Sequence, residues 1–294
     1  MEQRKLKILS FGEIIWDIFP THESLGGALL NFAAHAAMQG VESHLASAVG
    51  DDLLGKKAKA EIAALGLSVD RLSVCELPTG KAEIQLNEQS IPTFCIHFPS
   101  AYDRIHLEGI REDYDLLAIG SLALRRQENR RTLTSWMKEN PLCPVFCDLN
   151  LRAPHYDREG ILFCLSHAHY LKLSAEELWT VNKLLFDTTL SEEDSLRRLC
   201  HSYPTIRLVA LTKGAEGSVA YTPSTDIILS APAHKVEVVS TVGAGDSYSA
   251  TLMTHLLKGY PLSECLYRAS LVSALTCASP MAIPSYDPSV FWET

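Results

Sequence analysis

The residues best suited to chemistry lie late in the chain, in the segment 241–247, which reads TVGAGDS. The apolar residues 236–239 before it predict a strand, and the apolar positions after it predict a helix that stops at Gly259. The first N–H groups of a helix have no partner within the helix, and glycines let an anion approach them closely. The segment therefore predicts an anion-binding turn with a carboxylate, Asp246, directly beside it.

This carboxylate indicates more than phosphate binding, because two negative charges side by side repel each other. Asp246 fits a base that takes a proton from a nucleophile, while the turn holds the charge of a moving phosphoryl group. Considered alone, the segment is explained equally well by an ordinary helix start with an acidic first turn.

A second group of polar residues lies near the start of the chain. Asp17 stands among large apolar residues in the expected extended segment 14–19, where a carboxylate needs a hydrogen-bond donor. That donor is either a protein group or a ligand hydroxyl. The paired Gly26 and Gly27 open an alanine-rich helix that ends at Gly40. Packing explains the alanines but not Asn31, one turn into the helix, which is placed to reach a ligand.

Strands alternate with helices along most of the chain, which predicts a mainly parallel sheet covered on both faces. Ligands bind at the carboxyl edge of such sheets. Polar residues gather just after the expected strand ends, namely Asp17, Asp148, Asn150, Glu177, Thr212 and Asp246.

The segment 79–98 breaks this rhythm with two β-rich runs joined by a polar turn at 87–90. We interpret it as a projecting sheet or lid, to which residues of about 14–20 also contribute. Because no repeat or linker divides the chain, we expect a single domain over residues 1–294.

Composition excludes several classes of function. The formal net charge of -9 disfavours nonspecific binding to nucleic acid or to anionic membranes. Eight cysteines without a CxxC pair indicate reduced, mostly buried thiols, and His167 with His169 fits a structural pair better than a metal site. No apolar run is long enough for a signal sequence or a membrane span. We therefore expect a soluble cytoplasmic protein.

The common nucleotide and hydrolase motifs are missing from the sequence. Gly80 and Lys81 lack the glycine that a Walker P-loop needs, Gly12 is followed by Glu13 where a GxGxxG would begin, and no GxSxG is present. The turn at 241–247 remains the strongest signal.

In combination, six segments resemble the PfkB/ribokinase family of carbohydrate kinases. The segment 26–40 resembles the family's first signature and 241–247 its second, and 49–55 looks like the segment after the second strand. The segments 148–152 and 171–178 are similar to the fructokinase branch, and 211–218 resembles a nucleotide-side TxGxxG. Each motif is weak alone, but their order along nearly the whole chain is specific.

The resemblance implies a ribokinase-like fold and ATP-dependent transfer of a phosphoryl group to a sugar hydroxyl. Asp246 would accept the proton, and the amides of Gly243, Ala244 and Gly245 would stabilise the phosphoryl oxygens. Asp17, Gly26, Gly27 and Asn31 would bind the sugar, with Asn150 and Arg152 nearby.

The resemblance also implies residues on the nucleotide side. Thr212, Gly214 and Gly217 would lie along ATP, Lys172 near its phosphates, and Glu177 would act on Mg²⁺ through water. The lid would exclude water from the reaction and could form a homodimer contact.

Three positions depart from the family pattern. Ser240 stands where the family usually has an aspartate that helps to bind a monovalent cation, so we do not expect such a cation. Ser174 replaces a frequent asparagine, and the segment 278–282 replaces a glycine-alanine pair, which would reshape the adenine pocket.

Several functions stay open within this resemblance. A fructokinase is the first choice, and ribose, 2-keto-3-deoxygluconate and nucleoside kinases are the alternatives. Arg152 fits a loop or phosphate role slightly better than a partner for an acidic sugar. A catalytically silent sugar sensor is the alternative of a different class, although Asp246 argues against it.

Overall fold

The computed structural model describes residues 4–86, 92–110, 113–186, 190–287 and 289. The strands of its large sheet are β1 (Lys7–Phe11), β4 (Glu42–Gly50), β5 (Leu72–Cys75), β8 (Leu116–Gly120), β9 (Val145–Asp148), β10 (Tyr170–Ser174), β11 (Leu208–Thr212), β12 (Ser218–Thr222) and β13 (Ile227–Ala231). Within the described ranges these nine strands follow the order β13-β12-β11-β10-β9-β8-β1-β4-β5. The strands from β11 to β5 are parallel, and β12 and β13 add an antiparallel edge.

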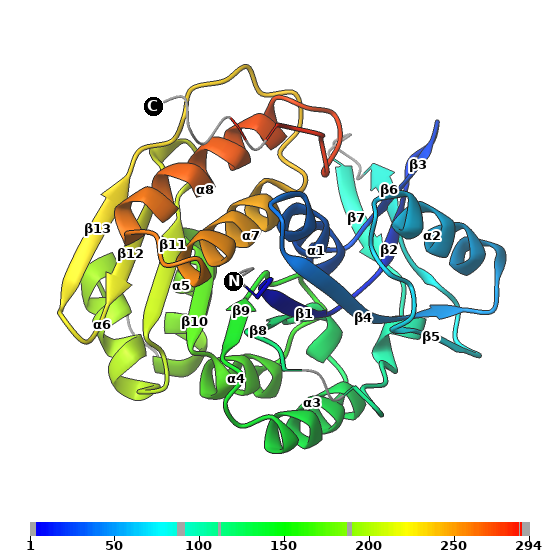
Figure 1. Ribbon diagram of the computed structural model, residues 1–294, viewed down its shortest axis with the longest axis horizontal. Helices are drawn as coiled ribbons and strands as arrows, with labels where there is room; N and C mark the ends of the chain where they lie inside the picture. Colours follow the sequence, from blue (N-terminus) through cyan, green and yellow to red (C-terminus); the bar gives the residue numbers. More distant parts are fainter. Residues whose placement is uncertain (1–3, 87–91, 111–112, 187–189, 288, 290–294) are drawn as a thin grey trace.

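Helices cover both faces of this sheet (Figure 1). The longer helices are α1 (Ala28–Met38), α2 (Leu53–Ala64), α3 (Gln127–Glu139), α4 (Arg158–His167), α5 (Ala175–Val181), α6 (Glu192–Ser202), α7 (Ala244–Leu257) and α8 (Leu262–Cys277). Side chains alternate along each strand, so that Ile8 and Phe146 pack with α1, α2 and α7, whereas Leu9 and Cys147 pack with α3 to α6. A smaller cluster packs α7 and α8 on β11 to β13.

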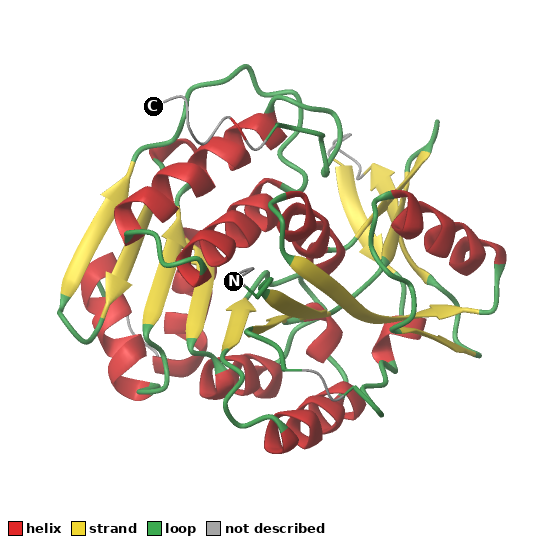
Figure 2. Ribbon diagram, viewed as in Figure 1, coloured by secondary structure: helices red, strands yellow, loops and turns green. Residues whose placement is uncertain are grey.

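A second sheet stands apart from the large one (Figure 2). Its strands are β2 (Ile15–Ile18), β3 (Glu23–Gly26), β6 (Gly80–Leu86) and β7 (Pro92–Ile96), in the order β3-β2-β6-β7. The segments 14–20 and 79–98 that we interpret as a lid supply three of these strands, and β3 is an addition that the sequence did not predict. The expected turn at 87–90 lies outside the described residues. That the sheet works as a lid stays a prediction.

The strand expected at 236–239 is wrong. Val238 and Val239 are 60% and 59% exposed, and no strand forms there. The amides of Val239 and Ser240 instead donate to the carbonyl oxygen of Cys277, 2.8 and 3.2 Å away, at the end of α8. The segment therefore crosses the end of a helix rather than joining a sheet.

Two helices also differ from the sequence prediction. The helix α6 was not predicted, although the Ser191 hydroxyl accepts from the Asp194 amide at 3.1 Å and marks its start. The sequence pattern predicts a last helix over 268–277, but the helix begins six residues earlier, at Leu262.

The cysteines form no disulfides among the described residues, and His167 and His169 make hydrogen bonds to backbone groups. All eight cysteines are free, with Cys147, Cys164, Cys200 and Cys265 buried and Cys95 exposed. The ring Nδ1 of His169 accepts from the Val145 amide at 3.1 Å, and that of His167 bonds to the Phe163 carbonyl oxygen. None of the described helices has the length and apolar character that crossing a bilayer requires.

One buried side chain holds the loops that follow β7 and β8. Asn129 of α3 is fully buried, its Oδ1 accepts from the Ile105 amide at 2.9 Å, and its Nδ2 donates to the carbonyl oxygens of Tyr102 and Ala123, both at 2.7 Å. These bonds fix the short helical turns η1 (Ala101–Asp103) and η2 (Leu122–Leu124) against α3.

The variant Asn129→Ala should lower the free energy of unfolding by about 2–4 kcal/mol, because it leaves one amide and two carbonyl groups buried without partners. Chemical denaturation measures this loss. Gln127→Ala, on the exposed side of the same helix, is the control and should change stability by less than about 1 kcal/mol. Equal effects of the two variants would contradict the role given to Asn129.

Candidate active site

The turn before α7 has the geometry expected of the anion-binding turn that the sequence predicts. Gly243 is the N-cap residue, with φ 78°, and the Ser247 amide makes the first helical bond to its carbonyl oxygen at 2.9 Å. The Ala244 amide bonds to the Thr241 carbonyl oxygen at 3.3 Å, so this amide is less open than the sequence implied. Within the described ranges no backbone acceptor is recorded for the amides of Gly243, Gly245 or Asp246. These three are placed to receive an anion.

Gly243 needs to be a glycine for two reasons. Its backbone is left-handed, and a Cβ at this position would lie 2.6 Å from the carbonyl oxygen of Ala282. Ala282 is itself held by α1, because its carbonyl oxygen is 3.0 Å from Nε2 of the buried His35. The C-terminal segment therefore packs directly behind the turn.

The carboxylate of Asp246 faces α1. Asn31 donates from Nδ2 to Oδ2 of Asp246 at 2.8 Å, and the Oδ1 atom of Asn31 is buried without a partner among the described residues. Loss of water around Asp246 and the nearby charge of Asp148 raise its pKa to about 6, although the Asn31 bond and the Lys172 charge oppose this. Asp246 is therefore ionised at neutral pH but readily accepts a proton.

A buried ion pair lies beside the turn. Lys172 Nζ is 3.0 Å from Asp148 Oδ1, and the Ser249 hydroxyl donates to Asp148 Oδ2 at 2.7 Å. Burial disfavours the charged ammonium, but Asp148 and the nearby acids hold the pKa of Lys172 above its usual value. A Cβ on Gly245 would lie 3.0 Å from Nζ. The missing side chain therefore lets a cation stand next to the open amides.

Glu13 is a site residue that the sequence patterns did not single out, although it follows the end of β1 as the other polar residues follow their strands. Its Oε1 accepts from the Ala28 amide at 2.8 Å, at the start of α1. The carboxyl is only 2% exposed, and burial raises its pKa to about 7. The Glu13 carbonyl oxygen would lie 2.3 Å from a Cβ on Gly27, which has φ 126°. The backbone that follows β1 therefore comes so close to the start of α1 that the second residue of the pair has to be a glycine.

The remaining residues predicted to bind sugar surround this point. The Asp17 carboxylate on β2 lies over Gly26, and burial raises its pKa to about 6 against the opposing charge of Arg152. Arg152 is exposed, and its charge also acts on Glu13 and Asp246. Asn150 has a left-handed φ of 40°, and its backbone carbonyl oxygen accepts a hydrogen bond from the Ser121 hydroxyl at 3.3 Å. The structure thus brings β2, α1, α7 and the loop after β9 together around Asp246.

The residues predicted for the nucleotide side follow β10 and β11. Thr212 ends β11, and Gly214 and Gly217 have φ of 54° and 94° in the turn before β12. A Cβ on Gly217 would lie 2.1 Å from the Ala231 carbonyl oxygen. Ser240 bonds locally, its hydroxyl accepting from the Val242 amide at 3.2 Å.

Glu177 has a structural bond on each carboxylate oxygen. Oε2 accepts from the Ser174 amide at 2.7 Å and Oε1 from the Leu151 amide at 2.5 Å, so that Glu177 joins α5 to the loop after β9. A carboxylate has about four acceptor positions, so water can still bind. No group of three metal-ligating side chains occurs in the ranges that the structure describes.

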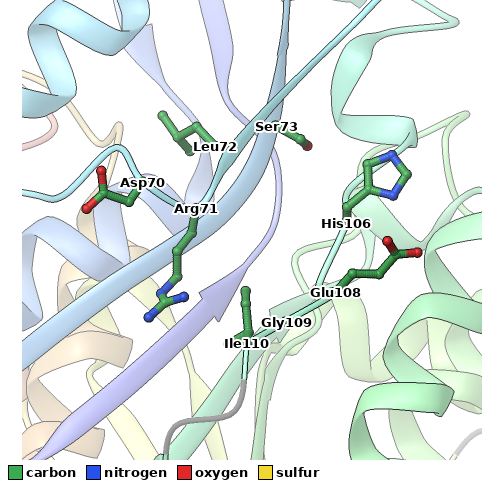
Figure 3. A pocket seen from close by; sticks show the side chains of 8 residues that line it. All are labelled: Asp70, Arg71, Leu72, Ser73, His106, Glu108, Gly109 and Ile110. Atoms are coloured by element: carbon green, nitrogen blue, oxygen red, sulfur yellow. The ribbon is translucent and has the colours of Figure 1, made fainter.

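Two hollows in the surface lie away from these residues. One, of about 200 Å³, is lined by the start of β5 and the loop toward β8, and Figure 3 shows Asp70 and Arg71 on one side of it and His106 and Glu108 on the other. A second hollow, of about 630 Å³, adjoins α3 and shares His106 and Glu108. None of the predicted site residues lines either hollow. The case for an active site therefore depends on the groups around Asp246.

Comparison with known proteins places the chain in a family. The model described as "pfkB family carbohydrate kinase" matches residues 3–288, so the chain belongs to the PfkB family of carbohydrate kinases. It is an ATP-dependent sugar phosphotransferase, as the sequence predicted.

Individual relatives are distant but match along most of their length. Fructokinase-2 of Zea mays is 25% identical over 314 residues, covering 95% of this chain and 90% of that protein. A nucleoside kinase of Methanocaldococcus jannaschii is 26% identical over 261 residues, covering 86% and 78%. The structure of a fructokinase with bound ATP from Xylella fastidiosa superposes with a TM-score of 0.83 at 20% identity, covering 94% of each chain. The predicted ribokinase-like α/β fold is confirmed.

Two glycines allow a matched test of the turn. Gly243→Ala should lower stability by about 2–4 kcal/mol and reduce phosphoryl transfer strongly, because the new methyl group collides with Ala282 and displaces the open amides. Gly259→Ala, at the same left-handed conformation but with no atom within 4 Å, should cost only about 1–2 kcal/mol and retain activity. Thermal unfolding and a kinase assay compare them. Similar activity of the two variants would contradict the role given to the turn.

Proposed function

We propose that this kinase is a fructokinase that transfers the γ-phosphoryl group of ATP to a hydroxyl of D-fructose, with Asp246 as the base. The observation that carries the proposal is the Asp246 carboxylate, held by Asn31 at 2.8 Å beside the open amides of α7. A base within reach of both sugar-binding groups and an anion site suits in-line transfer between two substrates.

The reaction moves one proton and exchanges one phosphorus–oxygen bond. The sugar hydroxyl gives its proton to Asp246, its oxygen bonds to the γ-phosphorus, and the bond to the β-phosphate oxygen breaks, which releases ADP. The amides of Gly243, Gly245 and Asp246 and the Lys172 ammonium lower the energy of the charge on the transferring group. Glu177 would hold Mg²⁺ through water, and that ion would further neutralise the charge of the phosphates.

The charges around Asp246 support a neutral sugar. Asp246 and Asp17 place two carboxylates around the proposed sugar position, and the cation of Arg152 acts on both. Carboxylates accept hydrogen bonds from sugar hydroxyls but repel an acidic substrate. A nucleoside is the next neutral choice, as for the relative from M. jannaschii, and a 2-keto-3-deoxy acid is disfavoured.

The nucleotide position is supported by two exposed apolar segments. Val236, Val239 and Met281 are 38%, 59% and 58% exposed, on the segments that precede the turn and follow α8. Such side chains suit the flat face of an adenine ring, with Thr212, Gly214 and Gly217 along the phosphates. The Ser240 hydroxyl is bonded locally and adds no charge, so we do not propose a monovalent cation here.

The second sheet is placed to act as the lid over the sugar. It carries Asp17 on β2, and its outer strands β3 and β7 have unpaired edges within the described sheet. Such edges favour pairing with another chain, which supports a homodimer through the lid.

A direct test measures ADP release with fructose, ribose, 2-keto-3-deoxygluconate and nucleosides. Fructose should give the highest kcat/KM, and Asp246→Asn should lower kcat about 10³-fold with little change in sugar affinity. Asp70→Asn, beside the surface hollow, is the control and should keep normal turnover. Sugar binding without turnover on any substrate would favour the silent sensor, and an active Asp246→Asn variant would exclude the base.

The pKa of Asp246 predicts how turnover depends on pH. Because the base must be ionised, kcat should rise with pH through about 6 and level off above it. Asn31→Ala removes a donor to the ionised form, so the rise should move to higher pH. Asp148→Asn removes a neighbouring negative charge, so the rise should move to lower pH. Profiles of kcat from pH 4.5 to 8 measure both shifts, and a shift in the same direction for both variants would contradict this electrostatic account.

A further inference from the structure

Glu13 is a buried acidic group of the site that has no step in the proposed reaction. It follows β1, which lies between β8 and β4 in the large sheet, and it is 15 positions before Ala28, whose amide donates to it. The N-cap of α1 is Gly27, which has no side chain to cap the helix. Glu13 therefore supplies, from the loop between β1 and β2, the cap that the helix lacks.

The capped end of α1 leads directly to the base. The Asn31 amide bonds to the Gly27 carbonyl oxygen at 2.9 Å, so Asn31 lies one turn beyond the cap. Its side chain reaches Asp246 at 2.8 Å, which is a contact between residues 215 positions apart. A shift of the first turn of α1 would lengthen this bond, because the helix carries Asn31 with it.

We propose that Glu13 is a positioning residue for phosphoryl transfer: its carboxyl group fixes the start of α1 and thereby holds Asn31 against Asp246. The hydrogen bond of Glu13 to the Ala28 amide and the packing of Leu29 against Gly12 both tie the first turn of α1 to the loop after β1. The inference rests on Asp246 as the proposed base, but not on which sugar is the substrate.

The surroundings of Glu13 favour the uncharged form of its carboxyl group. Asp246 from α7 acts on it with a negative charge, Arg152 from the loop after β9 with a positive one, and Tyr102 of η1 is also close enough to interact. Burial has the largest effect and raises the pKa of Glu13 to about 7. Its Oε2 is buried without a partner among the described residues. Burying a charged carboxylate oxygen in this way costs much free energy.

A double-mutant cycle between Glu13 and Asn31 tests the proposal. Glu13→Ala should lower kcat about tenfold or more, with a smaller change in KM for ATP, because the base loses its alignment. In the Asn31→Ala background the same change should lower kcat less than about threefold, because the contact that Glu13 maintains is already gone. Glu13→Gln keeps an oxygen for the Ala28 amide and should restore most of kcat.

The control is the cap of another helix. Ser191→Ala removes the cap of α6 and should have the same effect on kcat with or without Asn31. If Glu13→Ala does not fold, Glu13→Asp, whose shorter side chain cannot reach Ala28, takes its place in the cycle. The proposal is overturned if the loss in kcat is the same in both backgrounds, or if Glu13→Gln is as slow as Glu13→Ala.

A second readout does not depend on catalysis. The folded-state pKa of Glu13 lies above its usual value of 4.5, so its contribution to stability is complete below pH 4.5 and is lost as pH rises through about 7. The Tm of Glu13→Gln should therefore rise relative to the natural chain between pH 5 and 8. A difference in Tm that is constant or falls with pH would overturn the uncharged cap, even if Asp246 proves not to be the base.

Discussion

The structure of the site depends on keeping one carboxylate ionised where water is scarce and other acids are near. Asp246 is stabilised by the positive end of α7, by the amide of Asn31 and by the charge of Lys172, against burial and against Asp148. Each of these groups comes from a different element, so the arrangement requires β9, β10, α1 and α7 to meet at one edge of the sheet. The pKa of about 6 that results suits a base working near neutral pH.

The turn before α7 depends on contacts that lie far away in the sequence. Ala282 of the C-terminal segment packs against Gly243, and its carbonyl oxygen is hydrogen-bonded to the buried His35 of α1. The Tyr286 hydroxyl receives a bond from Gln39 of the same helix at 3.0 Å, which fixes the segment further along. The helix that carries the sugar-side residues therefore also supports the wall of the phosphate-side turn, and a disturbance of α1 should affect both substrates.

Sequence reasoning predicted the parts of this site whose signals are local. A glycine turn before a helix and a polar residue in an alanine-rich helix identify Asp246 and Asn31 without any knowledge of the fold. Glu13 escaped notice because its cap on α1 joins residues that only the folded chain brings together. The prediction of a strand at 236–239 is wrong because the sequence of such a run does not show whether it pairs with a sheet or packs against the end of a helix. The three hydrogen bonds of Asn129 are likewise tertiary.

The central claim is that Asp246 stands between the sugar hydroxyl and the transferring phosphoryl group. A crystal structure with fructose and a non-hydrolysable ATP analogue tests it most directly. The account predicts one fructose hydroxyl within about 3 Å of the Asp246 carboxylate, with the γ-phosphate at the amides of Gly243 and Gly245. A sugar bound with no hydroxyl near Asp246, or a γ-phosphate held away from this turn, would contradict it.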